Sequence, residues 1–149
     1  MFTPGMFGWR AQFERMERMF LKVSKPYFSS TEYLDDVQHF FQDCWHLKDW
    51  IKHDPTLSNA IAIEADVHAS VPLQIAADLA TAAKHYDRTF HRQGAYATSQ
   101  GVVIHLGQNR PADIDLRITL GDGTDFPAPE VVRNAFEAWK QILSKHGLL

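Results

Sequence analysis

The sequence predicts a mostly α-helical fold, a bundle of four or five helices with one antiparallel β-hairpin inserted before the last helix. Three observations predict it. Apolar residues recur every three or four positions through much of the first 90 residues, they alternate with period two between about 102 and 120, and the helical spacing returns after residue 129. At 149 residues, 45% hydrophobic and 22% charged, the chain has the size and composition of a single globular domain, residues 1–149.

Two helices are expected at the start of the chain. Apolar residues spaced four, three and four apart mark one face of the first, from about Trp9 to Val23. Ser29 and Glu32 form the pattern of a capping box that opens the second helix. That helix runs to about His53, because Pro55 cannot continue a helical ladder. On a helical wheel its apolar residues share one side, which predicts a core stripe of Tyr33, Val37, Phe40, Cys44, Leu47 and Ile51.

The remaining elements follow from the same patterns. A run rich in alanine after Pro72 favours a helix, because alanine has the highest helix propensity. Two stretches of alternating apolar residues flank the turn-rich GQNRPAD, which indicates a hairpin. We therefore expect a short helix over Ser58–His68, a helix over VPLQIAADLATAAKHYD, the hairpin over about 102–120, a loop over GDGTDFPAP, and a last helix from about Pro129 to Lys145 that Gly147 closes.

Charge and cysteine content exclude some classes of function. A formal net charge of -3 gives no general argument for binding nucleic acid or acidic lipid. Cys44 is the one cysteine, so no disulfide is expected, and a reducing setting fits. The N-terminal stretch lacks the apolar run of a signal peptide, and no segment reaches the roughly 20 apolar residues of a membrane span. A cytoplasmic protein without a membrane partner is expected.

The first helix carries a basic face opposite its apolar stripe. A solvated surface is the ordinary interpretation of such a face, and a phosphate-facing strip is the alternative. The basic residues along this segment are Arg10, Arg15, Arg18, Lys22 and Lys25.

The second helix carries a polar face that contains three histidines and a tryptophan. His39, His46 and His53 are seven residues apart and fall opposite the core stripe, with Asp43, Asp49 and Trp50 beside them. A face that met only water would have little reason to hold a tryptophan. We therefore expect the alanine-rich helix to cover part of this face.

If the alanine-rich helix covers this face, polar residues of the two helices meet along a seam. In this seam His46 and Asp49 would face His85 and Asp78. A histidine beside a carboxylate is an acid–base unit, because the carboxylate fixes the tautomer and raises the imidazole pKa. The alternative is a structural seam of hydrogen-bonded buried polar groups.

Metal binding is a third interpretation of the histidine face. Asp43-x-x-His46 and Asp49-x-x-x-His53 have spacings that metal ligands use. Carboxylate-bridged metal sites in helical bundles, however, need glutamates and Glu-x-x-His motifs from several helices, and this sequence contains no Glu-x-x-His motif. No metal and no other cofactor are expected.

A cationic cluster with interleaved aromatic residues follows the alanine-rich helix in KHYDRTFHR. Such a cluster at a helix end complements the helix dipole. It would also suit a phosphate grip, with the aromatic rings stacking on bases. Its cationic or protonatable residues are Lys84, His85, Arg88, His91 and Arg92.

The pairing of DCWHLKDW with a later DLATAAKHY resembles a group of uncharacterised bacterial proteins of the HEPN-like kind, over about 29–92. HEPN proteins are small helical bundles, often dimeric, from toxin–antitoxin and antiviral systems, and many are metal-independent ribonucleases. The resemblance implies a ribonuclease or an RNA-binding protein. It also implies RNA as a partner, together with a homodimer or an antitoxin-like partner protein.

The catalytic signature of that family is an arginine and a histidine with four to six residues between them. Here Arg88 and His91 have only two residues between them, so the sequence departs from the signature. In metal-free RNA cleavage, His85 or His91 would take the proton of the ribose 2′-hydroxyl, and Arg88 would stabilise the phosphorane. His46 or Lys84 would support them. Binding roles are expected for Asp49, Trp50, Asp78 and Arg92, and the alternative to all of these roles is a non-catalytic interaction protein.

Overall fold

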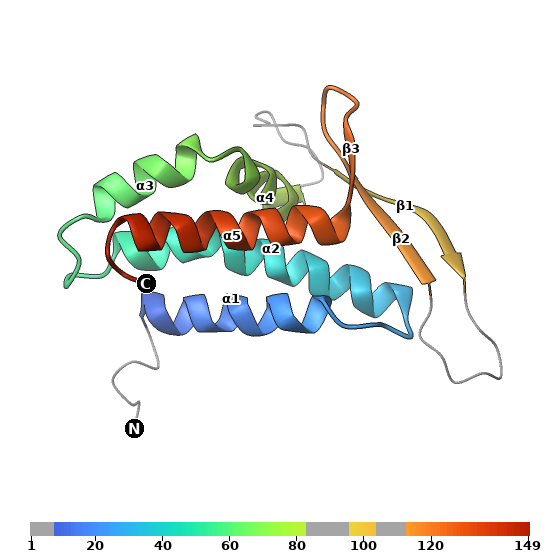
Figure 1. The fold of residues 1–149 in the computed structure, drawn as a ribbon, viewed down its shortest axis with the longest axis horizontal. Coiled ribbons are helices and arrows are strands. Elements are labelled where there is room, and N and C mark those ends of the chain that lie inside the picture. Colours follow the sequence, from blue (N-terminus) through green and yellow to red (C-terminus); the bar gives the residue numbers. More distant parts are fainter. Residues whose placement is uncertain (1–7, 83–95, 104–112) are drawn as a thin grey trace.

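The chain is mostly helical, with an antiparallel β-hairpin before the last helix, as the sequence predicts (Figure 1). The computed structural model describes residues 8–82, 96–103 and 113–149. None of the described helices is both long enough and apolar enough to cross a bilayer. The elements are α1 (Trp9–Val23), α2 (Ser30–Lys52), α3 (Ala60–Ala69), α4 (Val71–Ala82), β1 (Tyr96–Val103), β2 (Asp113–Thr119), β3 (Asp125–Pro127) and α5 (Ala128–Lys145).

Helix α2 is the central element of the bundle. It packs against α1 on one side, against α3 and α4 on another, and against α5, while the sheet lies at one end of the bundle (Figure 1). The Ser29 hydroxyl accepts a hydrogen bond from the Glu32 backbone N–H at 3.2 Å, which caps the helix where the sequence predicts. All six residues of the predicted core stripe are buried: Tyr33, Val37, Phe40, Cys44, Leu47 and Ile51.

Helix α5 joins this core through a buried tryptophan. The Trp139 indole N–H donates a hydrogen bond to the Cys44 carbonyl at 2.8 Å, so the ring is buried without leaving its polar atom unpaired. The helix ends as predicted, because Gly147 adopts a left-handed φ of 74°. The Leu148 N–H then reaches the Leu143 carbonyl at 2.8 Å, which completes a Schellman motif.

The β-structure is larger than the sequence predicts. Strands β1, β2 and β3 form one antiparallel sheet in that order, with Tyr96 opposite Thr119 and Arg117 opposite Pro127. Strand β1 begins at Tyr96 rather than near Val102, and its first residues show no alternation of apolar and polar types. The loop expected over GDGTDFPAP is wrong at β3, because a three-residue strand is too short to show period two. Residues 104–112 of the expected hairpin lie outside the described residues.

Candidate nucleic-acid interface

The predicted histidine face of α2 lies along α1. His39, His46 and His53 are exposed, and Asp36 and Asp43 precede the first two of them by three residues. Both carboxylates bind cations of α1. The Lys22 ammonium lies 2.9 Å from Asp36 Oδ2, and Arg15 Nε lies 3.4 Å from Asp43 Oδ1. We call this surface the α1–α2 edge, which comprises Arg15, Arg18 and Lys22 of α1 and Asp36, His39, Asp43, His46, Trp50 and His53 of α2.

A hydrogen-bonded cluster holds Asp36 at one end of this edge. The Tyr27 hydroxyl donates to Asp36 Oδ2 at 2.7 Å, and Lys22 binds the same oxygen. Burial alone would raise the pKa of Asp36, but the hydrogen bonds from Tyr27 and Lys22 outweigh burial and lower that pKa. For Tyr27, burial and this hydrogen bond raise the pKa of the phenol well above its ordinary value. The cluster therefore keeps a carboxylate charged and in place between α1 and α2.

Asp43 lies in a less favourable environment one helical turn before His46. Its side chain is 15% exposed, and its Oδ2 is buried without a hydrogen-bond partner among the described residues. Burial raises the pKa of Asp43, and the cationic Arg15 opposes that shift only in part. The histidine face thus meets α1 through one buried carboxylate that is hydrogen-bonded, Asp36, and one carboxylate with a buried oxygen that has no partner among the described residues, Asp43.

The polar seam predicted with α4 is wrong for the α2 residues assigned to it. His46 and Asp49 are exposed, whereas Asp78 on α4 is only 1% exposed. Helix α4 does pack against α2, but it meets the side that carries Gln38, whose amide donates to the Leu79 carbonyl at 2.6 Å. Gln38 and His46 lie about 80° apart around the helix, which leaves the histidine on the open side.

The buried surface of α4 explains this arrangement. Ala76, Ala77 and Ala80 are buried, so small side chains let α4 approach α2 closely, as the alanine-rich sequence predicts. The expectation that the alanine-rich helix covers Trp50 is wrong too. This ring is 37% exposed near the C-terminal end of α2, and α4 contacts α2 elsewhere.

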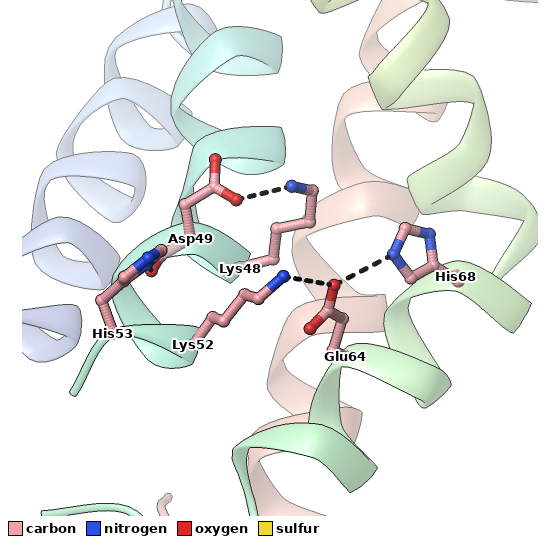
Figure 2. Close-up of polar contacts among 6 residues, drawn as sticks. All are labelled: Lys48, Asp49, Lys52, His53, Glu64 and His68. Carbon is pink, nitrogen blue, oxygen red and sulfur yellow. Dashed lines mark hydrogen bonds and ion pairs between the residues drawn. The ribbon is translucent and has the colours of Figure 1, made fainter. Parts of the chain in front are cut away.

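Two groups of ion pairs lie near the end of α2, and one of them joins α2 to α3 (Figure 2). The Lys48 ammonium lies 2.7 Å from Asp49 Oδ1 and 4.6 Å from the centre of the Trp45 ring. The Lys52 ammonium lies 3.6 Å from Glu64 Oε1, which also approaches His68 at 3.5 Å. These ion pairs place two lysines near the end of α2. Glu64 and His68 are four positions apart, so their pairing could be predicted from the sequence, whereas the contact of Glu64 with Lys52 depends on how α3 packs against α2.

A surface cavity of about 250 Å³ is lined by Asp49, Trp50 and His53. His53 Nδ1 lies 2.8 Å from the Asp49 backbone carbonyl, and because a carbonyl only accepts, Nδ1 is the donor. The hydrogen bond orients the imidazole and leaves Nε2 as an acceptor in the neutral ring or a second donor in the charged ring. Asp49, Trp50 and His53 therefore lie together at the end of α2.

The cationic cluster expected to act on RNA lies outside the described residues. It comprises Lys84, His85, Arg88, His91 and Arg92. In the last turn of α4, which precedes this cluster in the chain, the Thr81 hydroxyl donates a hydrogen bond to the Ala77 carbonyl at 2.6 Å.

One signal in the sequence pointed to the α1–α2 ion pairs and was missed. Arg15 and Lys22 are seven residues apart, and Asp36 and Asp43 are also seven residues apart. Seven residues are about two helical turns, so matched cations and anions on antiparallel helices predict two ion pairs. No signal of this kind pointed to Asp66, which binds Lys145 at 3.0 Å and His146 at 2.7 Å from the far end of the chain.

The described residues contain no group of three or more His, Cys, Asp and Glu side chains arranged to hold a metal ion. Comparison with known proteins adds no relative: no family model, no curated protein and no solved structure matches this chain.

Proposed function

We propose that this chain binds single-stranded RNA along the α1–α2 edge, as a HEPN-like protein would. The observation that carries the proposal is Trp50, which is 37% exposed and lies between His46 and His53 on the exposed side of α2. Aromatic rings beside a cationic track are the usual means of binding single-stranded nucleic acid, because every base has a face that stacks.

The charges along this edge support binding of a phosphate backbone. Arg15 keeps a 63% exposed side chain while it pairs with Asp43, and Arg18 is exposed on the same helix. Asp36 and Asp43 are held by α1 cations, which reduces their repulsion of an approaching phosphate.

The test is a titration of labelled single-stranded RNA with the Trp50→Ala variant, followed by fluorescence anisotropy. Loss of one stacked base should weaken binding by about tenfold, since such stacking contributes roughly 1–3 kcal/mol. Leu149→Ala is the matched control, because Leu149 is a 49% exposed apolar residue that belongs to neither α1 nor α2. Equal affinities for the wild type and Trp50→Ala, or no binding by either, would contradict the proposal.

We further propose that bound RNA is cleaved without a metal, by the residues that the sequence analysis assigns. His85 or His91 would remove the proton of the ribose 2′-hydroxyl, and Arg88 would stabilise charge on the phosphorane. Cleavage is then expected in the presence of EDTA and is lost in Arg88→Ala, while Arg88→Ala still binds RNA through Trp50. Binding without cleavage by the wild type would leave an RNA-binding protein and exclude the nuclease.

A second candidate function, binding of a second copy of this chain, is favoured by the outer face of α3. Ile61 is 87% exposed and Val71 at the start of α4 is 51% exposed, with the exposed Ala62 and Ala65 between them on α3. A helix that is apolar on both faces is normally covered on both. Sedimentation equilibrium should then detect a dimer that Ile61→Asp dissociates. A wild-type chain that sediments as a monomer would exclude this candidate.

A further inference from the structure

Helix α3 lies at the periphery of the bundle and carries an apolar stripe on its outer face (Figure 1). On a helical wheel Ile61, Ala65 and Ala69 fall within about 80° of one another, and all three are exposed. The buried residues of this helix, Ile63 and Val67, lie on the opposite side. Ile61 is 87% exposed, more than any other large hydrophobic residue that the structure describes. We call Ile61, Ala65 and Ala69 the α3 stripe.

The two carboxylates of α3 lie on either side of this stripe, and each is bound to a neighbouring helix. Glu64 and Asp66 are the sequence neighbours of Ala65, so they lie about 100° from it in opposite directions around the helix. Glu64 Oε1 lies 3.6 Å from the Lys52 ammonium of α2 (Figure 2). Asp66 Oδ2 lies 3.0 Å from the Lys145 ammonium of α5. The stripe is therefore uncharged, and each of its flanks carries one anion and one cation.

We infer that the α3 stripe packs against the α3 stripe of a second copy of this chain, as an antiparallel pair with Ala65 on the twofold axis. The inference rests on the second candidate function proposed above, binding of a second copy, and it specifies the orientation and register of the two helices. In this arrangement Ala65 faces Ala65 of the second copy. Ile61 of each copy faces Ala69 of the other.

The order of side chains along the stripe favours the antiparallel orientation. Ile61 and Ala69 each lie four residues from Ala65, which is about 6 Å along the helix axis in either direction. A twofold axis at Ala65 therefore brings the large side chain of each copy against a small side chain of the other. A parallel pair would set Ile61 against Ile61 at one end and would leave a gap between the two small Ala69 side chains at the other.

The charges beside the stripe favour a second copy as the partner. The twofold axis of an antiparallel pair sets each flank against the same flank of the second copy. Because each flank carries both signs of charge, it can pair with its own copy. The Lys52 and Lys145 side chains are 55% and 66% exposed, so both ammonium groups can reach a carboxylate of the second copy. An anionic membrane surface fits less well, because Glu64 and Asp66 place a carboxylate on each side of the stripe.

The length of α3 predicts a weak pair. The helix has 10 residues and is about 15 Å long, so two such faces bury less than the roughly 1,200–2,000 Å² of a stable interface. The dimer should therefore form in a concentration-dependent way, and a covalent cross-link is the appropriate means of trapping it.

The experiment places single cysteines on the stripe of the full chain and oxidises them, because a disulfide needs Cα atoms within about 7 Å of each other. Ala65→Cys should give a reducible dimer on non-reducing electrophoresis. Ile61→Cys and Ala69→Cys should each give little dimer alone and a mixed dimer when the two variants are combined. Asn134→Cys, at an exposed position of α5, is the control, and the native Cys44 is buried and should not react.

A second measurement needs no cross-link. Ala69→Ile sets two large side chains against each other and should weaken the dimer by about tenfold in sedimentation equilibrium. Adding Ile61→Ala to this variant exchanges the large and small positions of the stripe. The double variant should therefore recover the wild-type dissociation constant to within about threefold, since the two positions are coupled.

The outcomes separate this geometry from the proposed functions. A dimer in sedimentation that Ala65→Cys fails to trap overturns the antiparallel pair and leaves the second candidate function in place. A monomer that no cysteine cross-links overturns both, while RNA binding is tested independently through Trp50. Cross-linking of Ile61→Cys alone, without a mixed dimer, overturns the antiparallel orientation in favour of a parallel pair. Binding to phosphatidylglycerol vesicles that Ile61→Asp abolishes would assign the stripe to a membrane and overturn the inference.

Discussion

The Nε atom of Arg15 lies 3.4 Å from Oδ1 of Asp43, and this ion pair connects α1 to the histidine face of α2. Asp43 lies between His39 and His46 on one stripe of α2, so the contact places both histidines beside α1. The same contact leaves the other carboxylate oxygen buried without a partner among the described residues. This residue pair thus helps to hold α1 against the histidine face and leaves one buried carboxylate oxygen there without a partner among the described residues.

Asp43 should make the protein less stable as the pH rises from acid toward neutral. Burial raises the pKa of Asp43, so the folded state holds this proton to a higher pH than the unfolded chain. The stabilisation is complete below the unfolded pKa of about 3.9 and is lost as the pH rises through the folded pKa. Urea unfolding between about pH 4 and about pH 7 should show a smaller loss of stability with rising pH for Asp43→Asn than for the wild type. Asp35→Asn, on the exposed side of the same helix, should follow the wild type; identical slopes for all three would contradict the account.

Asp36 should show the opposite dependence. Its lowered pKa means that its contribution to stability is present above the unfolded pKa and is lost as the pH falls through the folded pKa. At neutral pH, Asp36→Asn should lower the free energy of unfolding by roughly 1.5–3 kcal/mol, the usual contribution of a hydrogen bond to a charged group. Tyr27→Phe removes one of the same hydrogen bonds and should show part of this effect. A difference between Asp36→Asn and the wild type that stays constant down to low pH would argue against the assignment.

Arg18 should contribute to RNA binding through charge alone. If it contacts one phosphate, Arg18→Gln reduces the salt dependence of binding, and the slope of log K against log salt falls in magnitude by about 0.7 for a single strand. Arg133→Gln is the matched control, because Arg133 is an exposed arginine on α5. Affinities measured over a series of salt concentrations give both slopes. Equal reductions for the two variants would mean that only net charge matters and that the α1–α2 edge has no special role.

The core should be sensitive to Leu47 and Trp139. Both side chains are fully buried, and their truncation leaves a cavity in the packing between α2 and α5. Leu47→Ala and Trp139→Ala should each reduce the free energy of unfolding by about 3 kcal/mol or more. Ile61→Ala, an exposed apolar residue, should change it by less than about 0.5 kcal/mol. Urea denaturation measures all three, and an unchanged midpoint for either core variant would refute the core assignment.

Much of the fold was predictable because its signals are local. The capping hydroxyl of Ser29, the helix break before Pro55 and the left-handed Gly147 each act on residues within about one helical turn. The sequence did not reveal β3 or the full length of β1, because strand pairing depends on residues far along the chain and three residues carry no measurable period.

For the site, the sequence located the polar residues of α2 but not the helix that borders them. It identified the histidine stripe and grouped Asp49 with Trp50, and the structure places both groups on one exposed side of α2. It assigned the wrong neighbouring helix to that side. Both α4, with its small alanines, and α1, with its basic face, were suitable neighbours for the polar face of α2. Composition alone therefore did not show which of the two helices borders it.

The sequence by itself determined which residues form helices and which side of each helix is apolar, because both depend on spacing within one or two turns. Only the tertiary structure decided that α1 borders the histidines while α4 packs beside Gln38. The physical reason is that helix packing sums many weak contacts over both helices at once. The matched ion pairs of Arg15 and Lys22 and the close approach of the α4 alanines select this arrangement together, and neither is a property of one segment of the chain.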